Sequence, residues 1–464
     1  MAETDKQTQF NPAALAEAAL RVANQTHHTF LEFAKRHEHT ILMNPDPLGI
    51  LPVFQAFAAR VLGNPATLFA AQAHAWAEHL RIWQQAARHL FGGKSGDVRP
   101  AVQSDRRFRD PVWTENPFFD YLKQVYLLVA ETVLQIVNQG KEGFDPKTAH
   151  KLEFYSRQIV DALAPNNFLM TNPEVIRKTI ETGGTNLVQG LQNFLRDIDP
   201  KDGKLHVKMV DTSAFAIGRN IAATPGAVIY QNDLMQLIQY KPSTREVYRR
   251  PLLITPPWIN KYYILDLQPK NSFIKWAVDR GHTVFVISWV NPGAELADKD
   301  FADYVFEGPI AALDAIEKAT DEREVNCVGY CIGGTLLGTA LAYMRGKGDT
   351  RVQSATFFTS LLDFSDVGDI GAFIDEDQIR QLEGEMNERG FLDGTEMANA
   401  FNMLRANDLI WSFVINNYLL GKEPAAFDLL YWNADSTRMP ARMHSTYLRK
   451  MYLQNALREP GGMT

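Results

Sequence analysis

Cysteine is scarce in this sequence, with Cys327 and Cys331 as its two examples among 464 residues. Two cysteines are too few for a disulfide framework, and no histidine lies near them at the spacing of a zinc site. The aspartates crowded between residues 363 and 377 show no octahedral ligand pattern and are interpreted as turn and cap residues. The composition favours a reducing, cytoplasmic environment, and we predict no metal and no other cofactor.

An excess of positive charge and long hydrophobic runs are also missing. The net charge is -7 and the pI is near 5.9, which argues against a general nucleic-acid binder. The longest apolar run, at residues 48–59, contains Pro52 and is too short to span a bilayer. Residues 1–10 are polar, so we expect neither a signal peptide nor a transmembrane segment.

Helical spacing of apolar residues prevails from residue 12 to residue 198. We therefore predict a helical N-terminal domain over residues 1–205. Its longest candidate helix, residues 65–91, ends at a pair of glycines. We favour core packing for the large side chains of this helix over a lipid-like or polymer-binding surface. These side chains belong to Leu68, Phe69, Trp76, Leu80, Trp83 and Leu90.

Beyond residue 205 the pattern changes to short strands that alternate with helices, as a parallel sheet requires. Residues 206–464 are predicted to form an α/β domain. The stretch 361–457 leaves that rhythm and is interpreted as a lid inserted after the sixth strand, which would exclude water from a site. The predicted strands are 227–230, 234–240, 251–254, 283–288, 325–328 and 353–358, with helices at 272–280 and 301–319 between them.

The segment Gly329-Tyr330-Cys331-Ile332-Gly333 joins the fifth predicted strand to a helix. Glycines two residues before and two after a nucleophile are typical of the nucleophile elbow of an α/β-hydrolase, because the tight turn leaves no room for side chains there. The alternative is a buried structural cysteine before a glycine-rich helix start. The strand before the motif and the helical spacing after it favour the elbow, with Cys331 as the nucleophile.

The two backbone donors of an oxyanion hole follow from the same fold. One is the N–H of the residue after the nucleophile, Ile332, and the other comes from the loop after the third strand. In that loop, Trp258 or Ile259 is the expected donor, and Trp258 is our first choice.

A cysteine nucleophile needs a base and a carboxylate, which follow it in chain order in this fold. The single histidine after Cys331 is His444, which lies in a helical context of the lid and not in a loop after a core strand. We therefore do not assign it as the base, and we expect the last two core strands to be missing before Thr464.

Sulfur at the elbow has a chemical consequence. An acyl group that moves from a thioester donor to a cysteine remains a thioester, so the step is nearly neutral in energy and the acyl group stays reactive toward a hydroxyl acceptor. The thiol therefore favours acyl transfer from a CoA thioester over ester hydrolysis, although some cysteine hydrolases use the same elbow.

Several longer blocks point to one family. Together with the elbow, the chain resembles the class I polyhydroxyalkanoate synthases from about residue 105 to its end. The blocks are DRRFRDPVW (105–113), PPWINKYYILDLQP (256–269), GHTVFVISWVNP (281–292), LLDFSDVGD (361–369) and NDLIW (407–411).

The resemblance implies an α/β-hydrolase catalytic domain with a lid, preceded by a helical domain tied to dimerisation and granule association. It also implies polymerisation of (R)-3-hydroxyacyl-CoA, typically 3-hydroxybutyryl-CoA, with release of CoA and a growing polyester chain. A homodimer in the cytoplasm, bound to polyester granules, is expected. Of the family's Cys, Asp and His triad, only the cysteine carries over, onto Cys331, and His444 matches a lid histidine.

A polypeptide that ends at Thr464 is expected to be inactive alone and poorly soluble, because the base is missing and a sheet edge is left open. A true truncation and a shortened sequence are the two alternatives. Two other functions remain: a cysteine-dependent hydrolase of esters or lactones, and a non-catalytic truncation product that still binds granules or a full-length partner.

Overall fold

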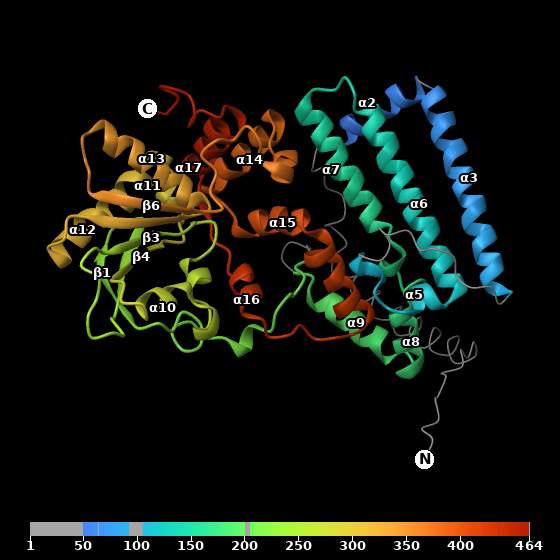
Figure 1. The fold of residues 1–464 in the computed structure, drawn as a ribbon, viewed down its shortest axis with the longest axis horizontal. Coiled ribbons are helices and arrows are strands. Elements are labelled where there is room, and N and C mark those ends of the chain that lie inside the picture. The colour runs from blue at the N-terminus through green and yellow to red at the C-terminus, as the bar shows by residue number, and fades with distance from the viewer. Residues whose placement is uncertain (1–49, 64, 92–104, 200–204, 464) are drawn as a thin grey trace, which may run out of the picture. The chain divides into compact units, whose positions relative to one another are not determined.

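A computed structural model describes residues 50–63, 65–91, 105–199 and 205–463 (Figure 1). The helices predicted before residue 50 lie outside this described part. The described chain divides into two compact units. A helical unit runs to Lys208 and also takes in Arg405–Pro424, and an α/β unit contains Met209–Leu404 and Ala425–Thr464.

Three helices of the helical unit begin with the same pair of signals, a polar cap residue followed by proline. Asn116, Asp145 and Asn172 each accept hydrogen bonds from the first free backbone N–H groups, and the next residue is proline. The helical stretch that begins at Pro173 is divided by Gly183 and Gly184, both with positive φ. The helices are α2 (Leu51–Leu62), α3 (Pro65–Leu90), α5 (Val112–Glu115), α6 (Pro117–Gly140), α7 (Pro146–Ala162), α8 (Pro173–Glu181) and α9 (Thr185–Arg196).

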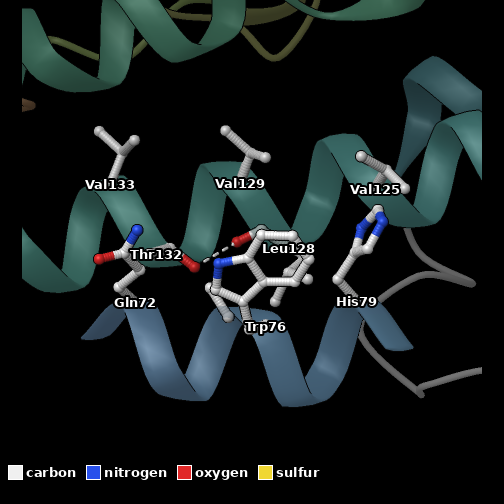
Figure 2. Close-up of a pocket in the computed structure, with 9 residues that line it drawn as sticks. Gln72, Trp76, His79, Val125, Leu128, Val129, Thr132 and Val133 are labelled. Carbon is white, nitrogen blue, oxygen red and sulfur yellow. Dashed lines mark hydrogen bonds between the residues drawn. The ribbon is translucent and has the colours of Figure 1, made fainter. Parts of the chain in front are cut away.

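The large side chains of α3 do not lie in a core, so the prediction of core packing is wrong for them within the described part of the chain. Helix α3 packs along α6, and the residues that it buries there include Ala71 and Ile82. The aromatic residues are mostly exposed: Trp76 is 60% exposed although it also lines a groove against α6 (Figure 2), and Trp83 is 58% exposed. The helix has two apolar faces, and spacing alone does not tell which of them finds a partner. The other exposed members are Phe69, Leu80 and Leu90.

Part of the expected lid belongs to the helical unit. The side-chain amide of Asn193, on α9, donates to the Asn417 carbonyl at 3.0 Å, and Asn186 donates to the Leu419 carbonyl at 2.8 Å. A Cβ at Gly190 would lie 1.8 Å from the Tyr418 carbonyl oxygen, so the backbones touch. The returning segment contains two π-helical turns, η9 (Asn407–Trp411) and η10 (Val414–Leu419). The structure thus departs from the expectation of one uninterrupted lid.

The α/β unit contains a six-stranded sheet in the order β1-β2-β4-β3-β5-β6 (Figure 1). Strands β4, β3, β5 and β6 are parallel, while β2 runs antiparallel to both β1 and β4. All six predicted strands are present, within two residues at either end. They are β1 (Gly226–Gln231), β2 (Met235–Tyr240), β3 (Leu252–Thr255), β4 (Val284–Trp289), β5 (Val325–Tyr330) and β6 (Val352–Phe358).

The central strands are apolar on both faces because helices cover both sides, as parallel sheets require. Residues Val284–Ile287 of β4 are fully buried, and they divide between two core clusters. One cluster holds the side chains toward α12 and α13, and the other those toward α10. The helices between strands are α10 (Phe273–Val278), α11 (Phe301–Val305), the π-helical turn η7 (Phe306–Ile310), α12 (Ala311–Thr320) and α13 (Ile332–Gly346).

The rest of the α/β unit follows β6 and forms a mainly helical cover. Asp375 caps its longest helix, and Asp363 and Asp366 accept backbone hydrogen bonds in turns, as predicted for this acidic stretch. Among the described helices, none combines the length and the apolar character needed to cross a membrane. The cover contains η8 (Gly368–Phe373), α14 (Glu376–Arg389), β7 (Phe391–Leu392), α15 (Gly394–Leu404), α16 (Asp428–Ala434), β8 (Met439–Pro440), α17 (Ala441–Thr446) and the π-helical η11 (Tyr447–Leu453).

Candidate active site

Cys331 occupies the turn between β5 and α13. Its backbone has φ 55° and ψ -129°, a conformation that a residue with a side chain adopts at a cost on the order of 1–3 kcal/mol. The turn is held from the next strand, because the Cys331 N–H donates to the Phe358 carbonyl at 2.9 Å. The Cys331 carbonyl in turn accepts from the Gly334 N–H at 2.9 Å and begins the helix. Strand, strained turn and helix form the elbow geometry.

The glycines around the turn have no space for a side chain. A Cβ at Gly329 would lie 2.5 Å from the Gly334 Cα, and one at Gly333 would lie 2.3 Å from the Thr255 carbonyl oxygen. Gly334, which the sequence argument did not single out, is tighter still, since its Cβ would lie 1.9 Å from the Ser360 hydroxyl oxygen. The sequence feature that could have pointed to it is the pair of adjacent glycines after Ile332, of which Gly334 is the second.

The thiol of Cys331 is half-buried. Burial raises its pKa, and a hydrogen bond from the Ile332 N–H partly offsets this effect. That N–H, at the start of α13, is therefore directed at the sulfur. Within the described residues, the Ile332 N–H donates a hydrogen bond to the thiol, and no histidine or carboxylate side chain is bonded to the sulfur. At neutral pH the group is consequently a thiol that needs a base before it can act as a nucleophile.

His444 does not supply that base. It lies on α17, is completely buried, and its pKa is lowered to about 4 by burial. Its Nδ1 atom has no hydrogen-bond partner. A neutral imidazole enclosed in an apolar core fits a packing role, in line with our decision not to assign it as the base.

Trp258, the expected second oxyanion donor, lies in the loop after β3 and is buried. Its carbonyl accepts a hydrogen bond from the Thr437 hydroxyl, and its ring packs against Tyr304 with a centroid distance of 4.7 Å. Trp258 and Ile332 belong to one apolar cluster at the carboxyl ends of the adjacent strands β3 and β5. The fold thus brings the two predicted donors to the same end of the sheet.

Two tyrosines of η11 also lie close enough to the thiol to be influenced by its charge, and the sequence argument missed them. The hydroxyls of Tyr447 and Tyr452 are 3.5 Å apart. Burial is the main cause of the raised pKa of each, and the charge of Cys331 adds to the rise in both. A π-helical turn brings these side chains together, and no helical or strand spacing in the sequence predicts such a turn.

Apolar side chains from several elements surround the elbow. The cluster that contains Ile332 also takes in residues of α11, α13, α14, α17 and η11. Such surroundings exclude water and strengthen the effect of any N–H group aimed at a developing negative charge. The arrangement can therefore support acyl transfer through sulfur. The wall residues include Phe301, Tyr304, Leu336, Phe364, Met386, Met443 and Met451.

The fold and the elbow define a protein of the α/β-hydrolase fold, and the family model described as "alpha/beta hydrolase fold" matches residues 257–455. A second model, "Poly-beta-hydroxybutyrate polymerase (PhaC) N-terminus", matches residues 104–277. A bromoperoxidase structure from Bacillus anthracis shares 14% identity over 47% of this chain and 75% of its own, with a TM-score of 0.25. So loose a match adds nothing to the fold assignment.

Curated relatives agree with the two family models. The poly(3-hydroxyalkanoate) polymerase subunit PhaC of Rhizobium meliloti is 52% identical over 396 residues, covering 85% of this chain and 65% of that protein. The PhaC subunit of Cupriavidus necator is 39% identical over 441 residues, covering 94% of this chain and 73% of that protein. This chain therefore belongs to the poly(3-hydroxyalkanoate) polymerase (PhaC) family. It spans 65% of the length of the Rhizobium meliloti and Methylorubrum extorquens relatives.

Proposed function

We propose that this chain carries the acyl-transfer centre of a poly(3-hydroxyalkanoate) polymerase, with Cys331 as the acyl carrier. The observation that carries the proposal is the backbone of Cys331, whose positive φ presents the sulfur at the start of α13. A buried structural cysteine has no need of this strain, as Cys327 shows in an ordinary strand conformation four residues earlier. Membership of the PhaC family supports the same function.

The proposed substrate is an (R)-3-hydroxyacyl-CoA. The Cys331 sulfur, after losing its proton, attacks the thioester carbonyl; the new C–S bond forms, the bond to CoA breaks, and CoA leaves with a proton. In the second step, a hydroxyl of a hydroxyacyl group attacks the Cys331 thioester. An ester forms, and the proton of that hydroxyl returns to the sulfur. Each step passes through an oxyanion, for which Ile332 and Trp258 are the proposed N–H donors.

The product class follows from this chemistry. Because each transfer leaves a new hydroxyl at one end and a thioester at the other, repeated transfers give a polyester chain. The apolar wall of the site suits such a product and disfavours water as a competing acceptor. Association with polyester granules belongs to the same proposal.

The proposal is tested by supplying 3-hydroxybutyryl-CoA to the purified chain and following CoA release together with the fate of the acyl group. We expect a covalent acyl adduct on Cys331, seen by mass spectrometry, and polymer as the product. Turnover of this chain alone is expected to be slow, because no base contacts the thiol within the described residues.

Cys331→Ala is the control, and it should abolish both the adduct and CoA release while leaving the fold intact. Free 3-hydroxybutyrate in place of polymer would show a hydrolase instead. An adduct that persists in Cys331→Ala would overturn the assignment of the acyl carrier.

A further inference from the structure

An indole N–H in the apolar wall of the candidate site has no partner. Trp258 is 2% exposed, and its Nε1 atom is buried without a hydrogen-bond acceptor among the described residues. Burying a donor in this way destabilises a fold, because the group gives up water and gains no acceptor in its place. A phenylalanine at this position would pack as an aromatic ring without that loss. The unpartnered N–H therefore needs a physical explanation.

Two other indoles at the same loop are bonded in the ordinary way. The Trp289 Nε1 donates to the Pro256 carbonyl at 2.8 Å, and the Trp432 Nε1 donates to the Lys261 carbonyl at 2.7 Å. Trp258 lies between these two carbonyls in the chain. Acceptors are thus present around the loop after β3, and the packing leaves the Trp258 N–H without one.

Three aromatic rings hold the Trp258 side chain in place. The distance between ring centroids is 4.7 Å to Tyr304, 5.5 Å to Trp289 and 6.1 Å to Phe301. Tyr304 and Phe301 belong to α11, and Trp289 ends β4. A ring enclosed by so many others cannot rotate to bring its N–H to another acceptor. The donor is therefore fixed in direction before a ligand binds.

The same rings connect Trp258 to the nucleophile. Phe301 also stacks on Tyr447, with a centroid distance of 6.4 Å and an interplanar angle of 4°. Burial raises the pKa of Tyr447, and the charge of Cys331 adds to the rise, which places Tyr447 near the sulfur. The loop also touches the elbow, because a Cβ at Gly333 would lie 2.5 Å from the carbonyl oxygen two residues before Trp258. The indole therefore belongs to the wall around the nucleophile.

The chemistry of the indole restricts its partner to a hydrogen-bond acceptor. An indole N–H donates and does not accept, and an uncharged donor in an apolar wall suits a neutral oxygen. The acyl part of a 3-hydroxyacyl thioester carries two such oxygens, the carbonyl oxygen and the 3-hydroxyl oxygen. The carbonyl oxygen is the partner of the proposed backbone donors, so the 3-hydroxyl oxygen is left for the indole.

We propose that the indole N–H of Trp258 binds the 3-hydroxyl oxygen of the acyl group and makes the site select 3-hydroxyacyl over unsubstituted acyl thioesters. The inference rests on the proposed function, since it takes the hydroxyacyl thioester as the substrate. A site built to hydrogen-bond a substrate hydroxyl rejects the analogue that lacks it, because the buried polar group of the site then stays unpaired. The enclosed Nε1 of Trp258 is such a group.

Thioester binding to Cys331→Ala tests the proposal without turnover. Isothermal titration calorimetry with (R)-3-hydroxybutyryl-CoA and with butyryl-CoA gives two dissociation constants, and their ratio isolates the hydroxyl because the CoA parts are identical. We expect a preference of about tenfold for the hydroxyacyl ligand. Adding Trp258→Phe should weaken binding of the hydroxyacyl ligand by about tenfold and leave binding of butyryl-CoA almost unchanged.

Trp289→Phe is the matched control in the same background. It removes an indole N–H from the same aromatic group, but this N–H is bonded to the Pro256 carbonyl within the protein. Trp289→Phe should therefore lower stability and affect both ligands alike, so that the ratio of the two dissociation constants changes less than about threefold. Circular dichroism checks that each variant folds. If Trp258→Phe does not fold, 3-benzothienylalanine at position 258 replaces it, because sulfur then stands in place of the N–H and the ring keeps its size.

The indole proton gives a direct readout. In heteronuclear NMR spectra of labelled Cys331→Ala, the Trp258 indole signal is the one that disappears when Trp258→Phe is added. This signal should move to lower field with (R)-3-hydroxybutyryl-CoA and stay in place with butyryl-CoA, because a hydrogen bond deshields the proton. An N–H with a purely structural role would respond equally to the two ligands.

Three results would contradict the proposal. An unchanged ratio of dissociation constants in Trp258→Phe would overturn it and leave the N–H against an aromatic ring. Equal weakening of both ligands would also overturn it and assign the N–H to the thioester carbonyl. Binding of neither thioester, with no adduct on Cys331 in the parent chain, would instead refute the proposed function on which the inference rests.

Discussion

The backbone N–H of Cys331 donates a 2.9 Å hydrogen bond to the carbonyl of Phe358, the last residue of β6. This bond continues the parallel pairing of β5 and β6, in which Tyr330 lies opposite Phe358. The sheet thus holds the candidate nucleophile in its strained conformation, and the sulfur is placed by the backbone before any substrate arrives.

The space at Gly333 predicts the effect of adding one methyl group. Gly333→Ala would place a Cβ 2.3 Å from the Thr255 carbonyl oxygen and 2.5 Å from that of Pro256. Because both neighbours are backbone atoms of β3 and its loop, we expect a loss of stability of about 1–3 kcal/mol. The rate of acylation of Cys331 should also fall in Gly333→Ala, because the turn that carries the sulfur must shift.

Gly346→Ala is the matched control on α13, because nothing lies within 4 Å of the added Cβ. It should be neutral or stabilise by up to about 1 kcal/mol. Urea unfolding measures both variants, and an unchanged midpoint for Gly333→Ala would contradict the tight packing at the elbow.

The two cysteines should differ in reactivity. Burial raises the pKa of Cys331, and it raises that of Cys327 to about 12. Alkylation by iodoacetamide should therefore be slow at pH 7 and accelerate with pH at Cys331, which is half-buried, while Cys327 stays protected in the native protein. Peptide mass spectrometry after timed alkylation gives both rates. Rapid modification of Cys331 below pH 7 would show a thiolate and thus a base that contacts the sulfur.

His444 predicts a loss of stability in acid. Its folded-state pKa of about 4 lies below the ordinary 6.5, so the unfolded chain takes up the proton first as the pH falls. The stabilising contribution is complete above pH 6.5 and is lost between pH 6.5 and 4, by about 3 kcal/mol in total. In His444→Gln, the free energy of unfolding should depend less steeply on pH across this window.

His74→Gln, a substitution at an exposed residue, is the control for the unfolding measurement itself. Chemical unfolding at half-unit steps of pH measures all three proteins. Equal slopes for the parent and His444→Gln would mean that folding does not lower the pKa of His444.

An ion pair ties α14 to the helix that carries the two tyrosines. Arg449 of η11 makes two hydrogen bonds of 2.7 Å to the carboxylate of Glu383. Arg449→Gln should lower the unfolding free energy by about 1 kcal/mol, as a bidentate pair that is partly shielded from water allows. Arg380→Gln removes more exposed ion pairs within the same helix α14. It should change the unfolding free energy by less than about 0.5 kcal/mol. Similar losses in both variants would refute the distinction.

The order of the α/β elements could be predicted from the sequence. Short apolar runs bounded by turn residues indicated the six strands, and β3 and β4 are almost wholly apolar because they are buried on both faces. The elbow was also predictable from Gly329 and Gly333, since a turn without space excludes every larger residue. These constraints act within one short segment, so the residue types of that segment are enough to predict them.

The candidate site was predicted less completely. Tyr447 and Tyr452 lie near the thiol through a π-helical turn, and Gly334 meets Ser360, which lies 26 residues farther along the chain. Such contacts depend on distant segments that meet in space, and spacing within one segment carries no record of them.

The helical unit shows the same division between local pattern and tertiary contact. By itself, the sequence determined that α3 forms a helix and which of its residues share a face. Only the tertiary structure decided that Ala71 and Ile82 are buried while Trp76 and Trp83 are exposed, and that Arg405–Pro424 joins the helical unit. The physical reason is that an apolar face gains free energy from any partner that excludes water, so the choice of partner depends on shape complementarity between elements far apart in the chain.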